Sequence, residues 1–216
     1  MSLRKRFHAW ALTSGMDRYE AMVASRKSRL FEGLQGTVVE IGPGAGPNLR
    51  YCAGVSRWIG IEPNPYLHKK LEDQLTRLGI EGEVLSGEAS RIPLPDGTAD
   101  TLIATLVLCS VAHPEEVLRE VRRVLRPGGS FLFFEHVAAP PGSVLRGMQR
   151  LIRPSWKLMT DNCHPDRETE RLIRSAGFTG VTVDRFVLSI AFVAPHIAGR
   201  AVRPADDPSQ IAGDAS

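Results

Sequence analysis

A glycine-rich turn contains the first residues that could do chemistry. Residues 38–48 read VVEIGPGAGPN, an apolar run followed by Gly42, Gly44 and Gly46. A glycine turn after a buried strand lets a ligand approach the backbone, because no side chain stands in the way. Glu62 follows the first glycine by about 20 residues, the spacing at which an acidic residue of a Rossmann-type unit accepts hydrogen bonds from ribose hydroxyls. These residues predict a site for an adenosine ligand.

The spacing of the glycines distinguishes two classes of adenosine ligand. The dinucleotide fingerprint is G-x-G-x-x-G/A, whereas the glycines here are spaced G-x-G-x-G and are followed by Pro47. This spacing resembles motif I of the class I methyltransferases, which bind S-adenosylmethionine (SAM). SAM has no pyrophosphate, and its amino-acid end could be bound by Asn48 and Glu40. Glu40 could equally be a buried carboxylate that caps the turn, and the turn itself could have a purely structural role.

Further motifs support the same resemblance. Residues 87–89 (GEA) follow the third expected strand, where this superfamily holds adenine, and residues 92–97 (IPLPDG) and 122–129 (RRVLRPGG) look like its usual loops. The chain is therefore identified as a member of the class I SAM-dependent methyltransferases, with a methyltransferase type 11 domain. The resemblance implies SAM as the cofactor. The residues that it implies for cofactor binding are Tyr19, Glu40, Gly42, Pro43, Gly44, Gly46, Asn48, Glu62, Pro63, Asn64, Gly87, Glu88, Ala89, Thr105 and Leu106.

A narrower resemblance covers most of the chain. The mammalian methyltransferase-like thiol S-methyltransferases look similar to it at residues 105–111 (TLVLCSV), 134–139 (FEHVAA), 154–164 (PSWKLMTDNCH) and 194–199 (APHIAG). Those relatives methylate small alkyl thiols with SAM and carry an N-terminal membrane-associating segment. This chain departs from them at Glu62, where the group tends to have Asp, and at Pro43, where it tends to have Cys. Neither change removes the ribose contact or the turn.

The implied reaction needs few catalytic groups. Methyl transfer is an in-line displacement at a sulfonium carbon, so positioning and desolvation supply much of the acceleration. A thiol has a pKa of about 8.5 and is already partly ionised at neutral pH, so a donor-rich pocket would suffice. His136, just past the fifth expected strand, is the catalytic candidate, either as a base or as a stabiliser of the thiolate. The alternative is a histidine bonded to backbone.

Four further residues could line the acceptor site. Cys109 follows the fourth expected strand, and Trp156, Asp161 and His164 lie in an insertion where this superfamily builds its substrate specificity. Cys109 fits an apolar wall better than a nucleophile, and Trp156 could instead belong to the core. Asp161, Cys163 and His164 are residue types that bind metals, but no second cluster has ligand spacing, so no metal is predicted.

The sequence thus predicts a SAM-dependent S-methyltransferase that acts on a small, fairly apolar thiol, such as a metabolite, natural product or xenobiotic. The same superfamily includes enzymes that methylate quinone carbons and phospholipid amines, so a C- or N-methyltransferase is the main alternative. An NAD-dependent oxidoreductase and a non-catalytic SAM-binding protein are the others. The identity of the acceptor, the need for a general base and the oligomeric state stay open.

Helices that alternate with short apolar runs are expected to position these residues. The pattern predicts an α/β fold: a Rossmann-like, seven-stranded, mostly parallel sheet with helices on both faces and an antiparallel last strand. The expected strands are residues 37–41, 58–61, 83–85, 101–106, 130–134, 181–186 and 189–194. The expected helices are residues 17–34, one from about residue 47, 65–78, 115–125 and 167–176.

The chain is long enough for about one domain, with 216 residues. Residues 1–35 are expected to form N-terminal helices that cover the site. Residues 36–202 are expected to form the methyltransferase domain, with an acceptor-site insertion at roughly 138–165. The polar residues 203–216 are expected to be a disordered tail.

Composition excludes several classes of protein. Lys and Arg exceed Asp and Glu by only 27 to 24, so no nucleic-acid partner is predicted. No apolar run approaches the roughly 20 residues of a membrane-spanning helix. Three cysteines cannot form an even disulfide framework, which favours a reducing, cytoplasmic compartment. Phe7, Trp10 and Ala11 could share a helix face that packs within the protein or contacts a membrane surface weakly.

Overall fold

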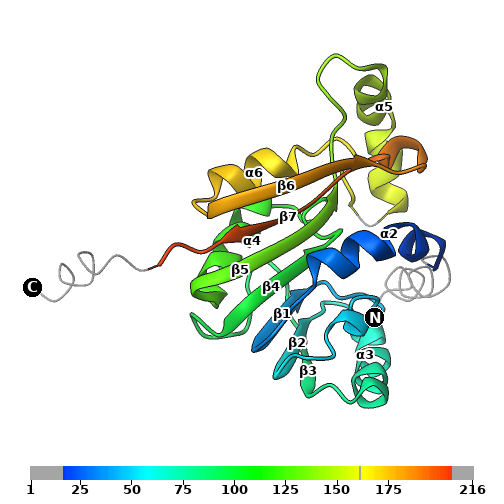
Figure 1. The fold of residues 1–216 in the computed structure, drawn as a ribbon. Coiled ribbons are helices and arrows are strands. Elements are labelled where there is room, and N and C mark those ends of the chain that lie inside the picture. The colour runs from blue at the N-terminus through cyan, green and yellow to red at the C-terminus, as the bar shows by residue number, and fades with distance from the viewer. Residues whose placement is uncertain (1–16, 161, 206–216) are drawn as a thin grey trace, which may run out of the picture.

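The computed structural model describes residues 17–160 and 162–205, and its centre is a seven-stranded sheet (Figure 1). The strands are β1 (Thr37–Ile41), β2 (Arg57–Ile61), β3 (Gly82–Leu85), β4 (Ala99–Thr105), β5 (Leu125–His136), β6 (Thr179–Val187) and β7 (Pro195–Val202). Their order across the sheet is β3-β2-β1-β4-β5-β7-β6. β7 is antiparallel to both of its neighbours, whereas the other neighbouring strands are parallel. The predicted fold class is confirmed, including the antiparallel last strand.

Helices cover both faces of the sheet (Figure 1). They are α2 (Asp17–Leu30), α3 (Pro65–Leu78), α4 (Pro114–Val124), α5 (Val144–Met159) and α6 (Thr169–Ser175). On one face, Val117 of α4 and Ile173 of α6 share a buried core with Val39 of β1. On the other, Leu71 of α3 packs with Val38, the residue before Val39 in the same strand. Successive residues of β1 thus point into opposite cores, as expected of a central parallel strand.

β1 and α3 form where the sequence predicts them. In α3, the side chain of Asn64 accepts a hydrogen bond from the N–H of Tyr66 at 3.2 Å, which caps the helix. Pro65 takes the first helical turn, where its missing donor costs nothing. Gly79 ends the helix with a left-handed backbone, at φ 64°. These local signals place Glu62 close to the start of α3.

The helix expected from about residue 47 is wrong. Only a short 3-10 turn, η1 (Leu49–Tyr51), forms there. Its N–H groups bond to carbonyls three residues before, as Cys52 does to Leu49 at 3.0 Å. Asn48 caps no helix, because its side chain bonds to Glu40 and Thr105. The segment is therefore held against the sheet as a turn.

The last strand lies later in the chain than expected. The prediction of a strand at 189–194 is wrong: this segment contains the 3-10 turn η2 (Ala191–Val193), and β7 begins at Pro195. The apolar pattern favoured the earlier run, but β7 lies inside the sheet, between β5 and β6. Gly199 is needed in β7 because a Cβ at this position would clash with the carbonyl of Thr182. β5 in turn begins earlier than expected, so residues 126–129 belong to this strand.

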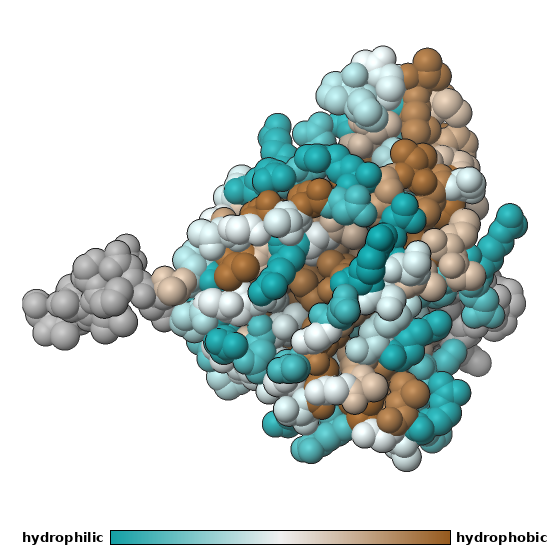
Figure 2. All heavy atoms as spheres, in the orientation of Figure 1, coloured by the Kyte–Doolittle hydropathy of each residue, from teal (hydrophilic) through white to brown (hydrophobic). Residues whose placement is uncertain are grey.

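The insertion after β5 forms α5, which projects from the sheet and carries apolar residues on its surface (Figures 1 and 2).

At the other end of the domain, the backbone N–H of Arg203 donates to the carbonyl of Gly129 at 2.9 Å, so the first residue of the expected tail is attached to β5. Phe7, Trp10, Ala11 and residues 206–216 lie outside the described residues. Within the described residues, no helix has the length and apolar character to cross a membrane.

Candidate active site

The carboxyl ends of β1 to β5 meet at one edge of the sheet, because these five strands run parallel. Gly42, Glu62 and Leu106 directly follow β1, β2 and β4, Gly87 comes just after β3, and His136 is the last residue of β5. Open parallel sheets bind ligands in the crevice at this edge. The fold therefore brings the predicted cofactor residues and the predicted catalytic histidine to the same edge.

The glycine turn after β1 has a backbone that other residues would strain. Gly42, Gly44 and Gly46 have φ values of 61°, 57° and 80°, in the left-handed region that glycine enters most readily. A Cβ on Gly42 would stand 2.8 Å from Cγ2 of Val107, so the turn lies directly against the segment after β4. Pro43 is buried between the first two glycines. The glycines of this turn can offer backbone to a ligand without a side chain in the way.

The buried carboxylate of Glu62 joins two turns. Its Oε2 accepts a hydrogen bond from the N–H of Gly44 at 3.0 Å, and its Oε1 accepts one from the N–H of Asn64 at 2.8 Å. The carboxylate thereby attaches the glycine turn to the start of α3. Pro63, which lies between Glu62 and Asn64 in the chain, is exposed. The end of the second strand is also the position from which a carboxylate reaches the ribose of an adenosine ligand.

Glu40 lies beneath the glycine turn. Its Oε1 accepts a hydrogen bond from Nδ2 of Asn48 at 2.8 Å, and its Oε2 accepts one from Nε1 of Trp58 at 3.3 Å. Nδ2 of Asn48 also donates to Oγ1 of Thr105 at 3.0 Å, which links the turn to the end of β4. Burial raises the pKa of Glu40 to about 7, against the opposing effects of Asn48, Lys27 and Trp58. These contacts favour the alternative in which Glu40 supports the turn.

The residues predicted to hold adenine follow β3. A Cβ on Gly87 would stand 2.9 Å from Cδ of Pro93 and 3.1 Å from Cγ2 of Ile61, so the backbone here packs closely on the end of β2. Glu88 is exposed and forms a backbone bridge with Arg91. Ala89 packs against the main core. This arrangement leaves an acidic side chain at the surface beside a tightly packed glycine.

The segment after β4 is held by the buried carboxylate of Glu135, which is not among the predicted site residues. Oε1 of Glu135 accepts hydrogen bonds from the N–H groups of Val107 and Leu108, both at 2.9 Å, and Oε2 accepts one from Cys109 at 3.3 Å. Burial raises the pKa of Glu135 to about 7. Leu106 opens the segment with φ 57°, a conformation that is uncommon for a residue other than glycine. A single acid directly after the apolar run 131–134 was the signal.

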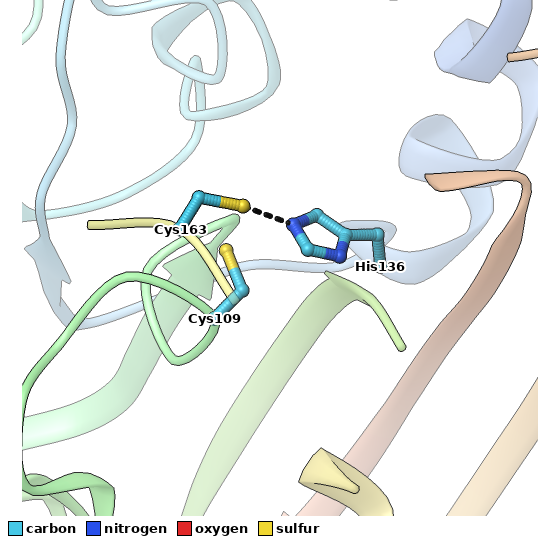
Figure 3. A group of neighbouring side chains, drawn as sticks. All are labelled: Cys109, His136 and Cys163. Atoms are coloured by element: carbon cyan, nitrogen blue, oxygen red, sulfur yellow. Dashed lines mark hydrogen bonds between the residues drawn. The ribbon is translucent and has the colours of Figure 1, made fainter. Parts of the chain in front are cut away.

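Three side chains from separate segments converge beside this loop (Figure 3). Cys109 follows β4, His136 ends β5 and Cys163 follows α5, and all three are buried. One donor atom of each lies within 4.8 Å of the others. Nε2 of His136 is 2.9 Å from Sγ of Cys163, and Nε1 of Trp156 donates to the same sulfur at 3.2 Å. Hydrogen bonds from Cys109, His136 and Trp156 lower the pKa of Cys163 to about 4, although burial opposes them.

The chain resembles known proteins over most of its length. Residues 39–133 match a protein-family model described as a methyltransferase domain. Human thiol S-methyltransferase TMT1B is 36% identical over 192 residues, covering 83% of this chain and 79% of the human protein. Human thiol S-methyltransferase TMT1A is 36% identical over 198 residues, covering 86% and 81%. The chain belongs to this family of SAM-dependent methyltransferases. The alternative of an NAD-dependent oxidoreductase is therefore wrong.

Other similarities are weaker in sequence. The ubiquinone/menaquinone biosynthesis C-methyltransferase UbiE of Salmonella arizonae is 28% identical to this methyltransferase over 186 residues, covering 74% of this chain and 72% of UbiE. A Haloferax volcanii methyltransferase, solved in complex with the Trm112 methyltransferase activator, superposes with a TM-score of 0.74 at 20% identity, covering 95% of this chain and 99% of that one. At that identity the structural match shows the fold alone.

The residues at the crevice fit SAM, the cofactor of this methyltransferase. The buried Oδ1 of Asn48 has no hydrogen-bond partner among the described residues, and it could accept from the ammonium group at the amino-acid end of SAM. Glu62 would hold the ribose, and the glycine turn would offer its backbone. Bound there, SAM supplies an electrophilic methyl group. Gly87, Glu88 and Ala89 would lie at the adenine end.

The remaining predicted residues occupy different places in the methyltransferase. Trp156 contacts the cluster through Cys163, whereas His164 contributes its backbone N–H to the carbonyl of Cys109 at 2.8 Å. The hydroxyl of Tyr19 is buried without a hydrogen-bond partner among the described residues, and burial raises its pKa. Asp161 lies outside the described residues. The structure therefore groups Cys163 with Cys109 and His136, whereas the sequence places it with its near neighbours Asp161 and His164.

Proposed function

We propose that this methyltransferase transfers the methyl group of SAM to the sulfur of a small, fairly apolar thiol. The observation that carries the proposal is the cluster of Cys109, His136 and Cys163, buried beside the segment that contacts the glycine turn. The thiol S-methyltransferases that are 36% identical to the chain support the same substrate class. All three cysteines are free thiols, which fits the proposed reducing, cytoplasmic compartment.

The cluster has the properties that a thiol acceptor needs. In the reaction the acceptor loses its proton, a new S–CH3 bond forms, the sulfonium C–S bond breaks, and S-adenosylhomocysteine and a thioether leave. The thiolate is the reactive form, so groups that favour a sulfur anion accelerate the step. The contacts of Cys163 support a local environment of this kind, because Nε2 of His136 and Nε1 of Trp156 lie 2.9 and 3.2 Å from its sulfur.

A product assay tests the proposal. Purified protein is incubated with SAM and a mixed panel of thiols, amines and quinones, and mass spectrometry identifies the methylated products. We expect methyl thioethers from small apolar thiols, and inhibition by S-adenosylhomocysteine. His136→Ala should lower turnover by about 100-fold or more while SAM affinity, measured by calorimetry, stays unchanged. Protein that binds SAM but methylates no thiol in the panel would overturn the proposed substrate class.

A second candidate function is methylation of a membrane-borne acceptor, such as a quinone carbon or a phospholipid amine. The observation that favours it is α5, whose surface carries strongly exposed apolar side chains and which reaches the cluster through Trp156. The similarity to UbiE points the same way. Incubation of the protein with labelled SAM and lipid vesicles containing quinones separates the two candidates. Label in lipid products, with none in thioethers, would favour the second.

A further inference from the structure

Cys109, His136 and Cys163 are the side-chain types that bind zinc. They come from three segments of the chain, and one donor atom of each lies within 4.8 Å of the others. Tetrahedral zinc has Zn–S distances of about 2.3 Å and Zn–N distances of about 2.0–2.1 Å, which separates its donor atoms by roughly 3.5–3.8 Å. The three donors therefore need shifts of only about 1 Å to surround one ion.

The backbone around the cluster is tied together. The carbonyl of Cys109 accepts the N–H of His164 at 2.8 Å, so the two cysteine-bearing segments are joined beside their sulfurs. The N–H of Cys109 donates to Glu135, the residue before His136 in β5. A guanidinium N–H of Arg167 donates to the carbonyl of Val111 at 2.7 Å, which fixes the far end of the loop. These bonds hold the three ligand positions together in the folded protein, and such preorganisation favours metal binding.

Hydrogen bonds around the donors also suit a metal site. Nε1 of Trp156 donates to Sγ of Cys163 at 3.2 Å, the kind of surrounding contact that orients a thiolate ligand. Two thiolates would neutralise the charge of a divalent ion, which favours burial of the complete site. Nε2 of His136 faces the sulfur of Cys163, and an imidazole nitrogen is a common zinc ligand (Figure 3).

We infer that Cys109, His136 and Cys163 bind one zinc ion, and that its open fourth position takes the sulfur of the acceptor thiol. The second half of this inference rests on the proposed function. Three protein ligands with one open position are the arrangement of catalytic zinc sites, whereas structural sites use four. A thiol that coordinates zinc is deprotonated. The metal would therefore generate the nucleophile at the carboxyl ends of β4 and β5.

The chemistry balances without an oxidant or a reductant. The acceptor R–SH coordinates zinc as a thiolate and its proton passes to solvent. The thiolate sulfur then attacks the methyl carbon, the sulfonium C–S bond breaks, and its electron pair stays on the sulfur of S-adenosylhomocysteine. The neutral thioether is a weaker zinc ligand than the thiolate, so the product leaves the open position. Zinc itself does not change its oxidation state.

Metal analysis tests the site itself. The full chain is stripped with a chelator, reloaded with zinc in the presence of a non-thiol reductant, desalted and analysed by plasma mass spectrometry. We expect about one zinc per chain in the wild type and in Cys52→Ala, which removes the third buried cysteine, outside the cluster. Cys109→Ser and Cys163→Ser should weaken zinc binding by at least about tenfold. Mutation of residues that only contact the ligands of a metal site already lowers metal affinity by about this factor. SAM titration of each variant verifies that it is folded.

Cobalt gives a second readout that is independent of activity. Cobalt(II) in place of zinc should produce an absorption band from sulfur-to-cobalt charge transfer in the wild type and in Cys52→Ala, but not in Cys109→Ser. Wild-type protein that holds no metal after reloading would overturn the inference. So would a metal content that is equal in all four proteins, or a reversible disulfide between Cys109 and Cys163 that forms in air while the reduced protein binds no zinc.

A final comparison separates this inference from the proposed function. Zinc-loaded and zinc-free protein are assayed with SAM and the thiol panel. We expect the zinc-free protein to retain less than about a tenth of the activity. Equal activity of the two forms would overturn the catalytic role of the metal and leave thiol methylation standing. A bound zinc with no thiol methylated by either form would overturn the proposed function and the acceptor's place on the metal.

Discussion

Single buried carboxylates position the backbone on both sides of the crevice. Glu62 accepts two backbone N–H groups and joins the glycine turn to α3. Glu135 accepts three N–H groups from the segment after β4, and Glu40 holds the glycine turn from below through Asn48. Hydrogen bonds to a charged group are stronger than those between neutral groups, and losing one inside the protein leaves its partner unsatisfied. Replacing one of these carboxylates should therefore alter the loop that it holds.

Glu62→Ala should weaken SAM binding. A hydrogen bond to a charged group contributes about 1.5–3 kcal/mol, so we expect a roughly 10- to 150-fold loss of SAM affinity by calorimetry. Asp73→Ala is the control, because Asp73 forms an exposed ion pair with Lys69 on α3 and should leave the affinity unchanged. Circular dichroism checks that both variants are folded. Folded Glu62→Ala protein with wild-type affinity would contradict the proposed contact with the ribose.

Glu40→Gln should change how stability depends on pH. Burial raises the pKa of Glu40 from its ordinary value of 4.5 to about 7. Between these values the folded protein holds a proton that the unfolded chain has released, so rising pH lowers stability across this window. We therefore expect the wild-type free energy of unfolding to fall, relative to that of Glu40→Gln, as the pH rises from 4.5 to 7. Urea unfolding at several pH values measures it, and a constant difference would contradict the prediction.

Residues close together in the chain could be recognised from the sequence, whereas the cluster could not. Gly42 and Glu62 directly follow the consecutive strands β1 and β2, so their spacing carried the signal. His136 and Cys163 are 27 positions apart in the chain, and Cys109 lies as far again before His136. Only the pairing of β4 with β5 and the path of the insertion bring them together. A single sequence shows neither of these.

At the scale of elements, the glycine turn can be tested against a second glycine with the same backbone. Gly42 and Gly79 have φ values of 61° and 64°, so alanine should cost about 1–2 kcal/mol at either position. A Cβ at Gly79 would meet nothing within 4 Å, but at Gly42 it would stand 2.8 Å from Val107. We expect Gly42→Ala to cost about 1 kcal/mol more and to lower SAM affinity, and Gly79→Ala to leave the affinity unchanged. Urea unfolding and calorimetry measure both, and equal effects would contradict the predicted constraint.

Elements with local boundary signals were predictable, and those shaped by their neighbours were not. Asn64, Pro65 and Gly79 mark both ends of α3 in the sequence. The 3-10 turn after residue 47 instead depends on the bonds from Asn48 to Glu40 and Thr105, which only the folded sheet supplies. Likewise, β7 is defined by its place between β5 and β6, so the apolar run before it gave the wrong strand.

For the whole molecule, α5 connects the proposed acceptor site with the surface. Its inner side carries Trp156, which contacts Cys163, and Gln149, which donates to the carbonyl of Phe192 at 2.9 Å. Its outer side has the four most exposed large apolar residues of the described chain (Figure 2). They are Val144, Leu151, Leu158 and Met159. The helix has no acidic residue, and Arg150, Arg153 and Lys157 lie along it. Such a helix suits an anionic phospholipid surface.

Glu substitutions on α5 should therefore abolish binding to anionic vesicles. Leu151 and Leu158 are 81% and 77% exposed, so Leu151→Glu and Leu158→Glu should not disturb the core. We expect the wild type, but not the double variant, to sediment with phosphatidylserine-containing vesicles, because the variant loses apolar area and gains two negative charges. Leu78→Glu, on the exposed end of α3, is the matched control and should sediment like the wild type. Methylation of a soluble thiol should be equal in all three proteins, since none of these side chains belongs to the cluster. Sedimentation of the double variant at the wild-type level would contradict a membrane contact through α5, and would also weaken the case for a membrane-borne acceptor.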